Sequence, residues 1–508
     1  MKPLYSFCAI SILIPALSCM PAQGASCESL GSLALPQTTI THARSVPAGR
    51  FEPPTPPGPT SFRNLPAFCR VAATLRPSSD SEIKIEVWMP AQDWNGKFQA
   101  TGNGGWSGAV SYGALARALA LGYATAGTDT GHSGGRGEFA LGHPEKLIDF
   151  GYRAVHEMTV KAKAIIAAYY GNGPRLSYWV GCSSGGKQGL KEAQKFPADY
   201  DGILAGAPAN YWTHLVTGDL WVSQTTLKDP ASYIPREKYP VIHKAALDAC
   251  DALDGVTDGL IENPMRCRFD PSVLACKDGD GPDCLTKPQV ESARKIYSGP
   301  IHPRSKKQIF PGLEPGSELG WGPLAGGPNP FRIADDHFKY VVFRNPNWDF
   351  KTLNFDSDVA LADKIDNGLL NAINPDLRKF LARGGKMILY HGWNDQLIAP
   401  RNTINYYENM AAKSGGMAKV SQSIRLFMAP GMAHCSGGEG PNTFDALTAL
   451  DQWVEHGKAP GRIIAAHSVN GIVNRTRPWC PYPEVAKYKG SGSIDDAASF
   501  ACVREKER

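Results

Sequence analysis

Two short strings, distant in the chain, restrict its fold more than any other feature. The string GCSSG at residues 181–185 matches the pattern G-x-S-x-G, which places Ser183 at the tip of a sharp turn between a strand and a helix. Downstream, His434 is followed by Cys435, just as Ser183 is preceded by Cys182. If the serine and the histidine meet within hydrogen-bonding distance, the two cysteines meet as well, and a disulfide needs Cα atoms about 4.4–6.8 Å apart. The two strings therefore predict a serine nucleophile with its base, and a disulfide that holds them together.

The residues around Ser183 predict the strand–turn–helix context that this pattern needs. Residues 176–180 form a short apolar stretch typical of a buried strand, and residues 187–195 are helical in character. Further strands are predicted at 83–88, 98–101, 123–128, 386–390 and 424–428, and further helices at 114–121, 155–169 and 403–413. Strands that alternate with helices favour an α/β fold with a largely parallel sheet.

This alternation stops between about residues 210 and 374, where prolines, glycine-rich turns and four cysteines appear. Together with the elbow around Ser183, this interruption predicts an α/β-hydrolase catalytic domain with a large inserted lid domain. The expected division is a signal peptide at 1–24, catalytic domain at 25–209, lid at 210–373 and catalytic domain again at 374–508. Residues 26 to about 60, rich in Pro, Ser and Thr, are expected to be an extended lead-in without a regular element.

The N-terminus has the pattern of a secretory signal peptide. Residues 1–2 give a positive start, residues 7–17 an apolar run, and residues 22–25 a small-residue cleavage site. A lipoprotein-type site at residues 16–19 fits poorly. The apolar run is too short to span a membrane, and no later stretch reaches about 18 uninterrupted apolar residues. We expect a secreted or periplasmic protein with no membrane contact after cleavage.

Charge excludes one class of partner. The formal net charge is +5 over 508 residues, and no block of Lys and Arg forms a basic footprint. We therefore expect no nucleic-acid binding. The sequence makes no prediction of the oligomeric state.

The chain has twelve cysteines, of which Cys8 and Cys19 fall in the signal peptide. Ten remain, and an even number in an exported protein indicates disulfides rather than metal thiolates. Short spacing predicts the bridges Cys250–Cys267, Cys276–Cys284 and Cys480–Cys502. The argument from the two strings predicts Cys182–Cys435, and the remaining pair is Cys27–Cys69.

A serine needs a base to take its proton, and that base needs an orienting acid. In this fold the acid and the histidine follow the serine along the chain. Asp395 comes directly after the strand predicted at 386–390, and His434 follows the strand at 424–428. Carboxyl ends of parallel strands carry functional groups in open α/β sheets, so these two residues are the predicted acid and base. The alternatives are His391 as base and Asp199 or Asp201 as acid.

The oxyanion of the tetrahedral intermediate needs two N–H donors. One is expected from the main chain of Ser184, the residue after the nucleophile. The other is expected from the glycine-rich string TGNGGW at residues 101–106, where Gly104 and Gly105 remain alternatives. An ordinary glycine turn is the competing interpretation of this string.

A second chemical signal lies in the predicted lid. Asp251, Asp254 and Asp258 have the spacing i, i+3 and i+7, which also fits one face of an acidic helix. Two glycines and the β-branched pair Val256-Thr257 favour a loop instead. Carboxylates and main-chain carbonyls suit a hard, oxygen-seeking ion, so the segment predicts calcium, although its spacing is not that of an EF-hand.

Five strings together make the chain similar to the tannase and feruloyl esterase family of bacteria and fungi, which includes the hydrolase of mono(2-hydroxyethyl) terephthalate. They are GCSSGG (181–186), DALDGVTDGL (251–260), FKYVVFRNPNWD (338–349), HGWNDQLIAP (391–400) and APGMAHCSGG (429–438). The resemblance covers nearly the whole chain after the signal peptide. It implies Ser183, Asp395 and His434 as the triad and agrees with the five disulfides.

The same resemblance implies a structural lid calcium held by Asp251, Asp254 and Asp258 and by the main-chain carbonyls of Val256 and Leu260. The family's substrates are esters of aromatic acids: galloyl, feruloyl and related hydroxycinnamoyl groups, and terephthalate monoesters. We therefore expect a serine carboxylester hydrolase, a feruloyl esterase or tannase, acting on a small aromatic ester or a phenolic-esterified polysaccharide.

Two alternatives remain. The first is hydrolysis of terephthalate monoesters, which is less favoured because Ser184 stands where the terephthalate member of the family has a glutamate. The second is a non-catalytic relative that binds phenolics or polysaccharide. Trp321, Phe331, Phe338 and Tyr340 are candidates to hold an aromatic ring, although each is favoured more as a core residue.

Overall fold

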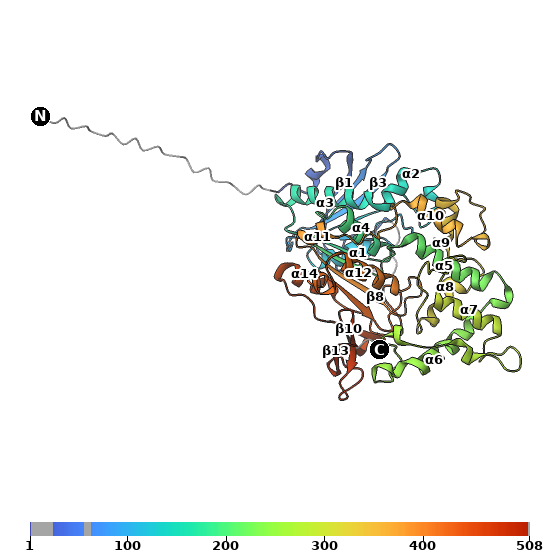
Figure 1. The fold of residues 1–508 in the computed structure, drawn as a ribbon. Helices are drawn as coiled ribbons and strands as arrows, with labels where there is room; N and C mark the ends of the chain where they lie inside the picture. Colours follow the sequence, from blue (N-terminus) through green and yellow to red (C-terminus); the bar gives the residue numbers. More distant parts are fainter. Residues whose placement is uncertain (2–23, 55–61, 506–508) are drawn as a thin grey trace.

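The computed structural model describes Met1, residues 24–54 and residues 62–505 (Figure 1). These residues contain a nine-stranded sheet with the order β1-β2-β3-β5-β4-β6-β7-β8-β9. The strands are β1 (Thr38–Val46), β2 (Phe68–Leu75), β3 (Ile83–Pro90), β4 (Lys97–Thr101), β5 (Ala124–Thr128), β6 (Leu176–Cys182), β7 (Gly202–Gly206), β8 (Lys386–Gly392) and β9 (Ile424–Ala429). Pairing is antiparallel from β1 to β5 and parallel from β5 to β9. The predicted signal peptide lies outside the described residues except at its two ends.

Helices cover both faces of this sheet. They are α1 (Tyr112–Ala120), α3 (Ala154–Tyr170), α4 (Ser184–Lys195), α12 (Arg401–Lys413) and α14 (Ala446–His456). One core cluster joins the sheet to α3, α4 and α12, and another joins it to α1 and α14. Every position of β4, β5 and β7 is buried, as expected for parallel strands covered on both sides. The arrangement is an α/β-hydrolase fold.

A long segment interrupts the sheet between two neighbouring strands. Gly202 of β7 pairs with Lys386 of β8, so the chain leaves the sheet after β7 and returns to the adjacent position. The excursion carries α5 (Trp212–Leu227), α6 (Tyr239–Cys250), α7 (Lys287–Ser298), α8 (Gly322–Ala325), α9 (Arg332–Asp336), α10 (Ser357–Asp366) and α11 (Arg378–Ala382). Helices α5 to α9 gather on one side of the sheet domain (Figure 1). The range 210–373, expected to be the lid, falls within this excursion.

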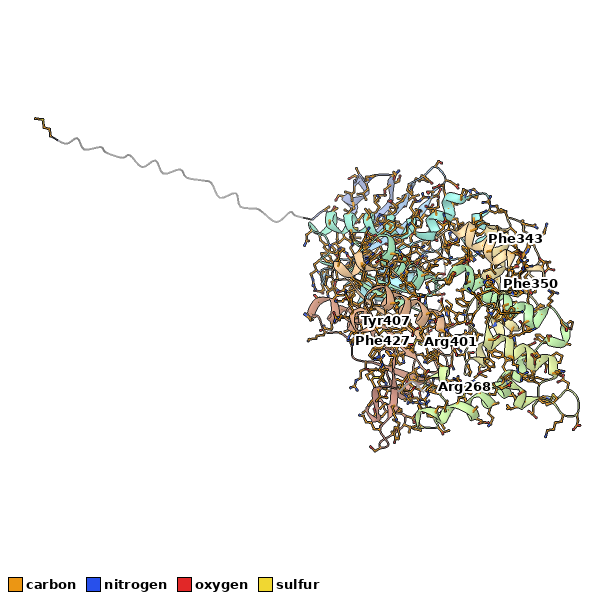
Figure 2. The ribbon with its side chains drawn as sticks, in the orientation of Figure 1. Arg268, Phe343, Phe350, Arg401, Tyr407 and Phe427 are labelled. Carbon is orange, nitrogen blue, oxygen red and sulfur yellow. A yellow bond between two sulfur atoms is a disulfide. The ribbon has the colours of Figure 1, made fainter. Side chains whose placement is uncertain are left out.

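The lid is tied to the sheet domain by a buried acid. Arg401, at the start of α12, donates to both carboxylate oxygens of Glu314, with Nη2 to Oε2 at 2.8 Å. Figure 2 shows Arg401 at the junction between the two parts. Because Glu314 is fully buried, this pair fixes the lid close to the loop that follows β8.

The remaining elements are short helices and C-terminal ribbons. They are α2 (Pro144–Ile148), α13 (Met417–Val420), β10 (Ile463–Val469), β11 (Ile472–Trp479), β12 (Glu484–Tyr488) and β13 (Phe500–Arg504). Strand β10 pairs with β11, and β12 with β13, both antiparallel. None of the helices in the described ranges has the length and apolar character needed to cross a membrane.

Most predicted elements are confirmed, and one expectation is wrong. The predicted strands correspond to β3, β4, β5, β6, β8 and β9, and the predicted helices to α1, α3, α4 and α12, with small shifts of their ends. The lead-in at 26–60 is not free of regular structure, because it contains β1 at the sheet edge, paired with β2. The segment of β1 has no proline and contains Thr, Ile and Val, which favour a strand, so the Pro-rich composition of its flanks misled the expectation.

All five predicted disulfides are confirmed. They are Cys27–Cys69, Cys182–Cys435, Cys250–Cys267, Cys276–Cys284 and Cys480–Cys502. The first of them anchors the lead-in beside β1 to the strand β2. The second links the last residue of β6 to the loop after β9.

Candidate active site

Ser183 lies at the turn between β6 and α4. Its backbone has φ 64° and ψ −124°, a conformation that costs a non-glycine residue about 1–3 kcal/mol. The surrounding structure holds it there, since its N–H donates to the carbonyl of Gly206 at 3.0 Å. A Cβ at Gly181 would stand 2.6 Å from the main chain of Gly185, so the turn closes too tightly for a side chain. The string GCSSG therefore forms the predicted strand–turn–helix elbow.

Asp395 and His434 lie on the loops that follow β8 and β9. His434 Nδ1 is 2.7 Å from Asp395 Oδ2. The Asp395 side chain is fully buried, and that of His434 is 15% exposed. The Cys182–Cys435 disulfide, with Cα atoms 6.0 Å apart, brings the histidine loop to the elbow. The structure thus gathers the three predicted residues at the carboxyl ends of β6, β8 and β9.

The surroundings of Asp395 keep it ionised. Its Oδ1 accepts the N–H groups of Leu397 and Ile398 at 2.8 and 2.9 Å. Burial acts to raise the pKa of Asp395, but the charge of His434 and hydrogen bonds from His391 and His434 hold that pKa well below its usual range. Burial acts to lower the pKa of His434, and the charge and hydrogen bond of Asp395 outweigh it, so that pKa is raised. A carboxylate-oriented imidazole of this kind is suited to take a proton from serine.

His391, the alternative base, is not available for proton transfer to substrate. Its Nε2 lies 3.1 Å from Asp395 Oδ2 and its Nδ1 lies 2.7 Å from Thr403 Oγ1. The side chain is fully buried. Both ring nitrogens are therefore occupied inside the protein.

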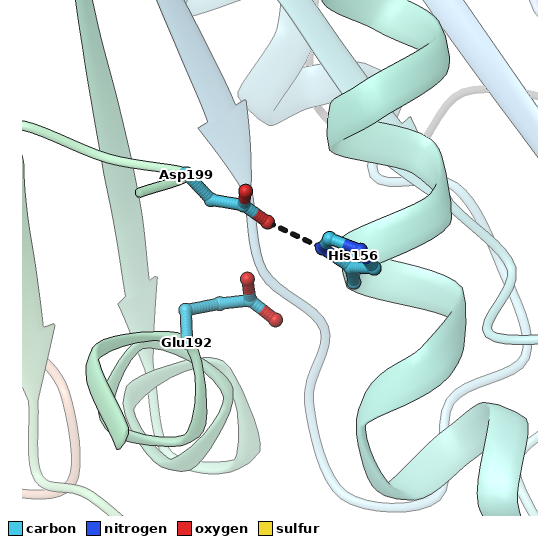
Figure 3. A group of neighbouring side chains, drawn as sticks. All are labelled: His156, Glu192 and Asp199. Atoms are coloured by element: carbon cyan, nitrogen blue, oxygen red, sulfur yellow. Dashed lines mark hydrogen bonds and ion pairs between the residues drawn. The ribbon is translucent and has the colours of Figure 1, made fainter. Parts of the chain in front are cut away.

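Asp199, one alternative acid, belongs to a separate cluster between α3 and α4 (Figure 3). Its Oδ2 lies 2.7 Å from Nδ1 of His156, and Glu192 points toward the same place. Burial and the charge of Asp199 raise the pKa of Glu192 well above its usual range. In the described part of the chain this cluster makes no contact with His434.

Asp201, the other alternative acid, caps a strand. Its Oδ2 accepts the N–H of Ser177 at 2.9 Å, at the start of β6. The start of a parallel strand lies at the opposite edge of the sheet from the elbow. Asp395 is therefore the acid that the structure supplies to His434.

Opening the Cys182–Cys435 bridge is expected to lower kcat by up to about a hundredfold, because the loop that carries His434 is then free to move away from the elbow. The variant is Cys182→Ser/Cys435→Ser, assayed for ester hydrolysis beside the wild type. The matched control is Cys276→Ser/Cys284→Ser, which opens a bridge of only 8 residues in the lid. If Cys182→Ser/Cys435→Ser folds and keeps the kcat of the wild type, the bridge does not position His434.

The predicted oxyanion donors lie together beside Ser183. Ser184 is the first residue of α4, and its Oγ donates to the carbonyl of Gly105 at 3.0 Å. Among the described residues, the N–H groups of Ser184, Gly104 and Gly105 have no hydrogen-bond acceptor. A Cβ on Gly104 would meet open space, whereas Gly105 has φ +51° and a Cβ there would stand 2.8 Å from Ile333 Cδ1. The helix N-terminus and the loop after β4 thus present free donors, with both glycines still candidates.

Trp106, which sequence reasoning did not single out, joins this loop to the lid. Its Nε1–H donates to the carbonyl of Ile333 at 3.0 Å, and its ring meets that of Trp212 at 4.8 Å between centroids. It is 1% exposed. In the sequence, Trp106 is marked only by its place directly after the glycine-rich string GNGG. That place does not indicate which lid residue Trp106 contacts.

The four aromatic residues proposed to hold a substrate ring divide into two pairs. Trp321 and Phe338 are fully buried in lid cores, with Trp321 packed against Tyr297. Phe331 and Tyr340 are half-buried. The first pair therefore has the core role that was favoured, and only the second pair remains open to a ligand.

Fold and site together place the chain in the class of α/β-hydrolases. A family model described as tannase and feruloyl esterase matches residues 69–503. An uncharacterised esterase of Xanthomonas campestris pv. campestris is 40% identical over 541 residues, covering 96% of this chain and 93% of its own length. A probable feruloyl esterase B-1 of Aspergillus flavus is 36% identical over 493 residues, covering 92% and 93%.

The crystal structure of feruloyl esterase B from Aspergillus oryzae superposes with a TM-score of 0.89 at 33% identity, covering 94% of this chain and 99% of its own. The chain belongs to the tannase and feruloyl esterase family. It is a carboxylic ester hydrolase.

Proposed function

We propose that the chain cleaves esters of hydroxycinnamic or gallic acid type through an acyl-enzyme formed on Ser183. The observation that carries this proposal is the buried Asp395–His434 pair, 2.7 Å apart, joined to the elbow by the Cys182–Cys435 bridge. The substrate class is supported by similarity to proteins named feruloyl esterase, which extends over most of both chains.

In the proposed reaction, Nε2 of His434 takes the proton of Ser183 Oγ while that oxygen attacks the ester carbonyl carbon. N–H groups of Ser184 and of Gly104 or Gly105 stabilise the oxyanion. The bond to the alcohol oxygen then breaks, and the alcohol leaves with the proton from His434. Water attacks the acyl ester on Ser183, giving its proton to the same nitrogen. The free acid leaves as the serine oxygen regains that proton.

The test of this function is a panel of kcat/KM values for methyl ferulate, methyl gallate, a terephthalate monoester and 4-nitrophenyl acetate. We expect methyl ferulate or methyl gallate to exceed the terephthalate monoester by about tenfold or more. A terephthalate monoester as the best of the three alkyl esters would contradict the proposed acyl specificity, whereas 4-nitrophenyl acetate, with its activated leaving group, checks general esterase activity. Binding of phenolic acids without turnover of any ester would instead support a non-catalytic relative.

We also propose that the protein is exported, with residues 1–24 as its signal peptide. Ten paired cysteines fit an oxidising compartment. N-terminal sequencing of the exported protein should find its first residue close to position 25. A mature chain that keeps residues 1–24 would contradict cleavage.

We further propose that the acidic lid segment binds a structural calcium ion. Residues 251–254 form a short 3₁₀ turn after α6, and Gly255 and Gly259 follow with φ +98° and +82°, so the segment is a loop as expected. Burial and the charge of Asp258 raise the pKa of Asp254 to about 6. The charge of Arg477 acts in the opposite direction and lowers that pKa, but it does not offset burial and the neighbouring carboxylates.

The donor set of this loop fits the ion. Val256 and Leu260 are buried, and their carbonyl oxygens accept no hydrogen bond from any residue that the structure describes. The carboxylate of Asp251 accepts two loop N–H groups, and that of Asp258 contacts Arg477, so a bound cation would share these carboxylates with their present partners. An ion with oxygen ligands would stabilise the loop, with no role in bond cleavage.

Removing calcium is expected to lower the thermal unfolding temperature by about 5 °C, because ligand that binds only the folded state stabilises it. The measurement is thermal unfolding with EGTA, then with added Ca²⁺ or Mg²⁺, where only Ca²⁺ should restore the temperature. The variant Asp254→Asn should respond less to EGTA than the wild type. A wild-type unfolding temperature that chelation leaves unchanged would exclude the calcium proposal.

A further inference from the structure

Asp395 has a second histidine partner besides His434. Nε2 of His391 lies 3.1 Å from Oδ2 of Asp395, the same oxygen that His434 Nδ1 approaches to 2.7 Å. This Nε2 also lies 3.0 Å from the carbonyl oxygen of Ile398. Both of its neighbours are acceptors only, so Nε2 of His391 carries a proton and donates it to Oδ2.

The His391 ring is held from its other side as well. Its Nδ1 lies 2.7 Å from Oγ1 of Thr403, which is fully buried in the first turn of α12. The N–H of Thr403 donates to the carbonyl of Pro400 at 3.0 Å, so the start of the helix fixes the hydroxyl. The imidazole is thus clamped between α12 and the loop that carries Asp395.

We propose that His391 is a positioning residue, whose Nε2–H bond to Oδ2 of Asp395 fixes the place and moderates the charge of the carboxylate that orients His434. The inference rests on the proposed function. With the donor present, all four acceptor positions of the Asp395 carboxylate are filled, by two main-chain N–H groups and two histidines. Without it, Oδ2 has one partner, and its negative charge acts more strongly on His434.

Among the residues that the structure describes, few titratable groups face this carboxylate. Titratable groups that face Asp395 are His391 and His434, together with Asp219 on α5. Burial and the charge of Asp395 raise the pKa of Asp219 well above its usual range, which disfavours a second negative charge beside Asp395. A change in the pKa of His434 after substitution at 391 therefore reports on Asp395.

Two substitutions separate the two nitrogens of the His391 ring. In His391→Gln, the amide nitrogen reaches the place of Nε2 and keeps a donor to Asp395. In His391→Asn, the amide nitrogen reaches the place of Nδ1, so only the hydrogen bond to Thr403 is kept. We expect His391→Asn to lower kcat about tenfold with KM unchanged. The acid limb of its kcat/KM pH profile should shift to higher pH by about half a unit to one unit. His391→Gln should stay within about threefold of wild type, with its acid limb in place.

The unfolding temperature of each variant is measured together with its pH profile. If His391 had only a structural role, its substitution would lower stability without shifting the acid limb. Folded His391→Asn with the wild-type acid limb, or equal losses in the two variants, would overturn the proposal. If neither variant folds, Thr403→Val provides the test, because it keeps the His391 ring and removes only the hydroxyl that holds Nδ1. The acid limb of the Thr403→Val profile should shift to higher pH by a smaller amount than in His391→Asn. An acid limb that does not shift in Thr403→Val would also overturn the proposal. Failure of the proposed function would differ, since the wild type itself would then hydrolyse none of the esters.

Discussion

Replacing Ser183 with alanine is expected to lower kcat/KM for aromatic esters by a factor of about 10⁴ or more, because the neighbouring hydroxyl, that of Ser184, is bonded to the carbonyl of Gly105 and does not replace the nucleophile. The fold should persist, since alanine carries the same backbone strain at φ 64° as serine and loses only an oxygen. The measurement is initial-rate hydrolysis of methyl ferulate or methyl gallate at enzyme concentrations high enough to detect the residual rate, together with the thermal unfolding temperature.

The matched control for this variant is the neighbouring serine. Ser184→Ala keeps the main-chain N–H proposed for the oxyanion and removes only the hydroxyl bond to Gly105, so its kcat should fall by less than about tenfold. Near-wild-type turnover by Ser183→Ala would remove Ser183 from the mechanism. Equal losses in the two variants would point to a damaged turn rather than a missing nucleophile.

Asp395→Asn is expected to lower kcat by about 10⁴ in the neutral range, as in comparable triads. The amide can donate to Nδ1 of His434, which leaves the proton on Nε2, where the serine proton has to go. The raised pKa of His434 also depends on the charge of Asp395, so any residual activity should extend to lower pH than in the wild type. The measurement is the pH profile of kcat for the two proteins.

Asp201→Asn provides the control for this charge removal. Asp201 caps Ser177 at the far end of β6, and its substitution should lower stability slightly and leave kcat within about twofold of wild type. Wild-type turnover in Asp395→Asn, or a large loss in Asp201→Asn alone, would mean that the acid has been assigned wrongly.

The sequence predicted the parts of the molecule that local pattern determines. The strand before Ser183 and the helix after it are contiguous with the nucleophile, and bridges such as Cys276–Cys284 close short loops. The long-range Cys182–Cys435 bridge was also predictable, because the chemistry of a serine and its base requires their neighbours to meet. Asp395 and His434 followed from chain order and from their places after apolar strands.

What the sequence did not predict depends on distant partners. Strand β1 (Thr38–Val46) has β-branched residues that suit a strand, but it has Pro-rich flanks and pairs with β2, to which the Cys27–Cys69 bridge anchors the lead-in. The role of His391 depends on one oxygen of Asp395 that serves two histidines, which no spacing reveals. The choice between Gly104 and Gly105 depends on where a substrate oxygen lies relative to two adjacent N–H groups.

The central claim is an ester of the substrate's aromatic acid formed on Ser183, and mass spectrometry of the protein during turnover tests it most directly. The protein is mixed with the 4-nitrophenyl ester of an aromatic acid, quenched in acid within the first turnover, and measured intact and after proteolysis. We predict a burst of 4-nitrophenol, an increase in protein mass equal to the acyl group, and its location on the peptide containing Ser183, all absent in Ser183→Ala. Turnover without any acyl adduct on Ser183, or with the adduct on another residue, would contradict the account.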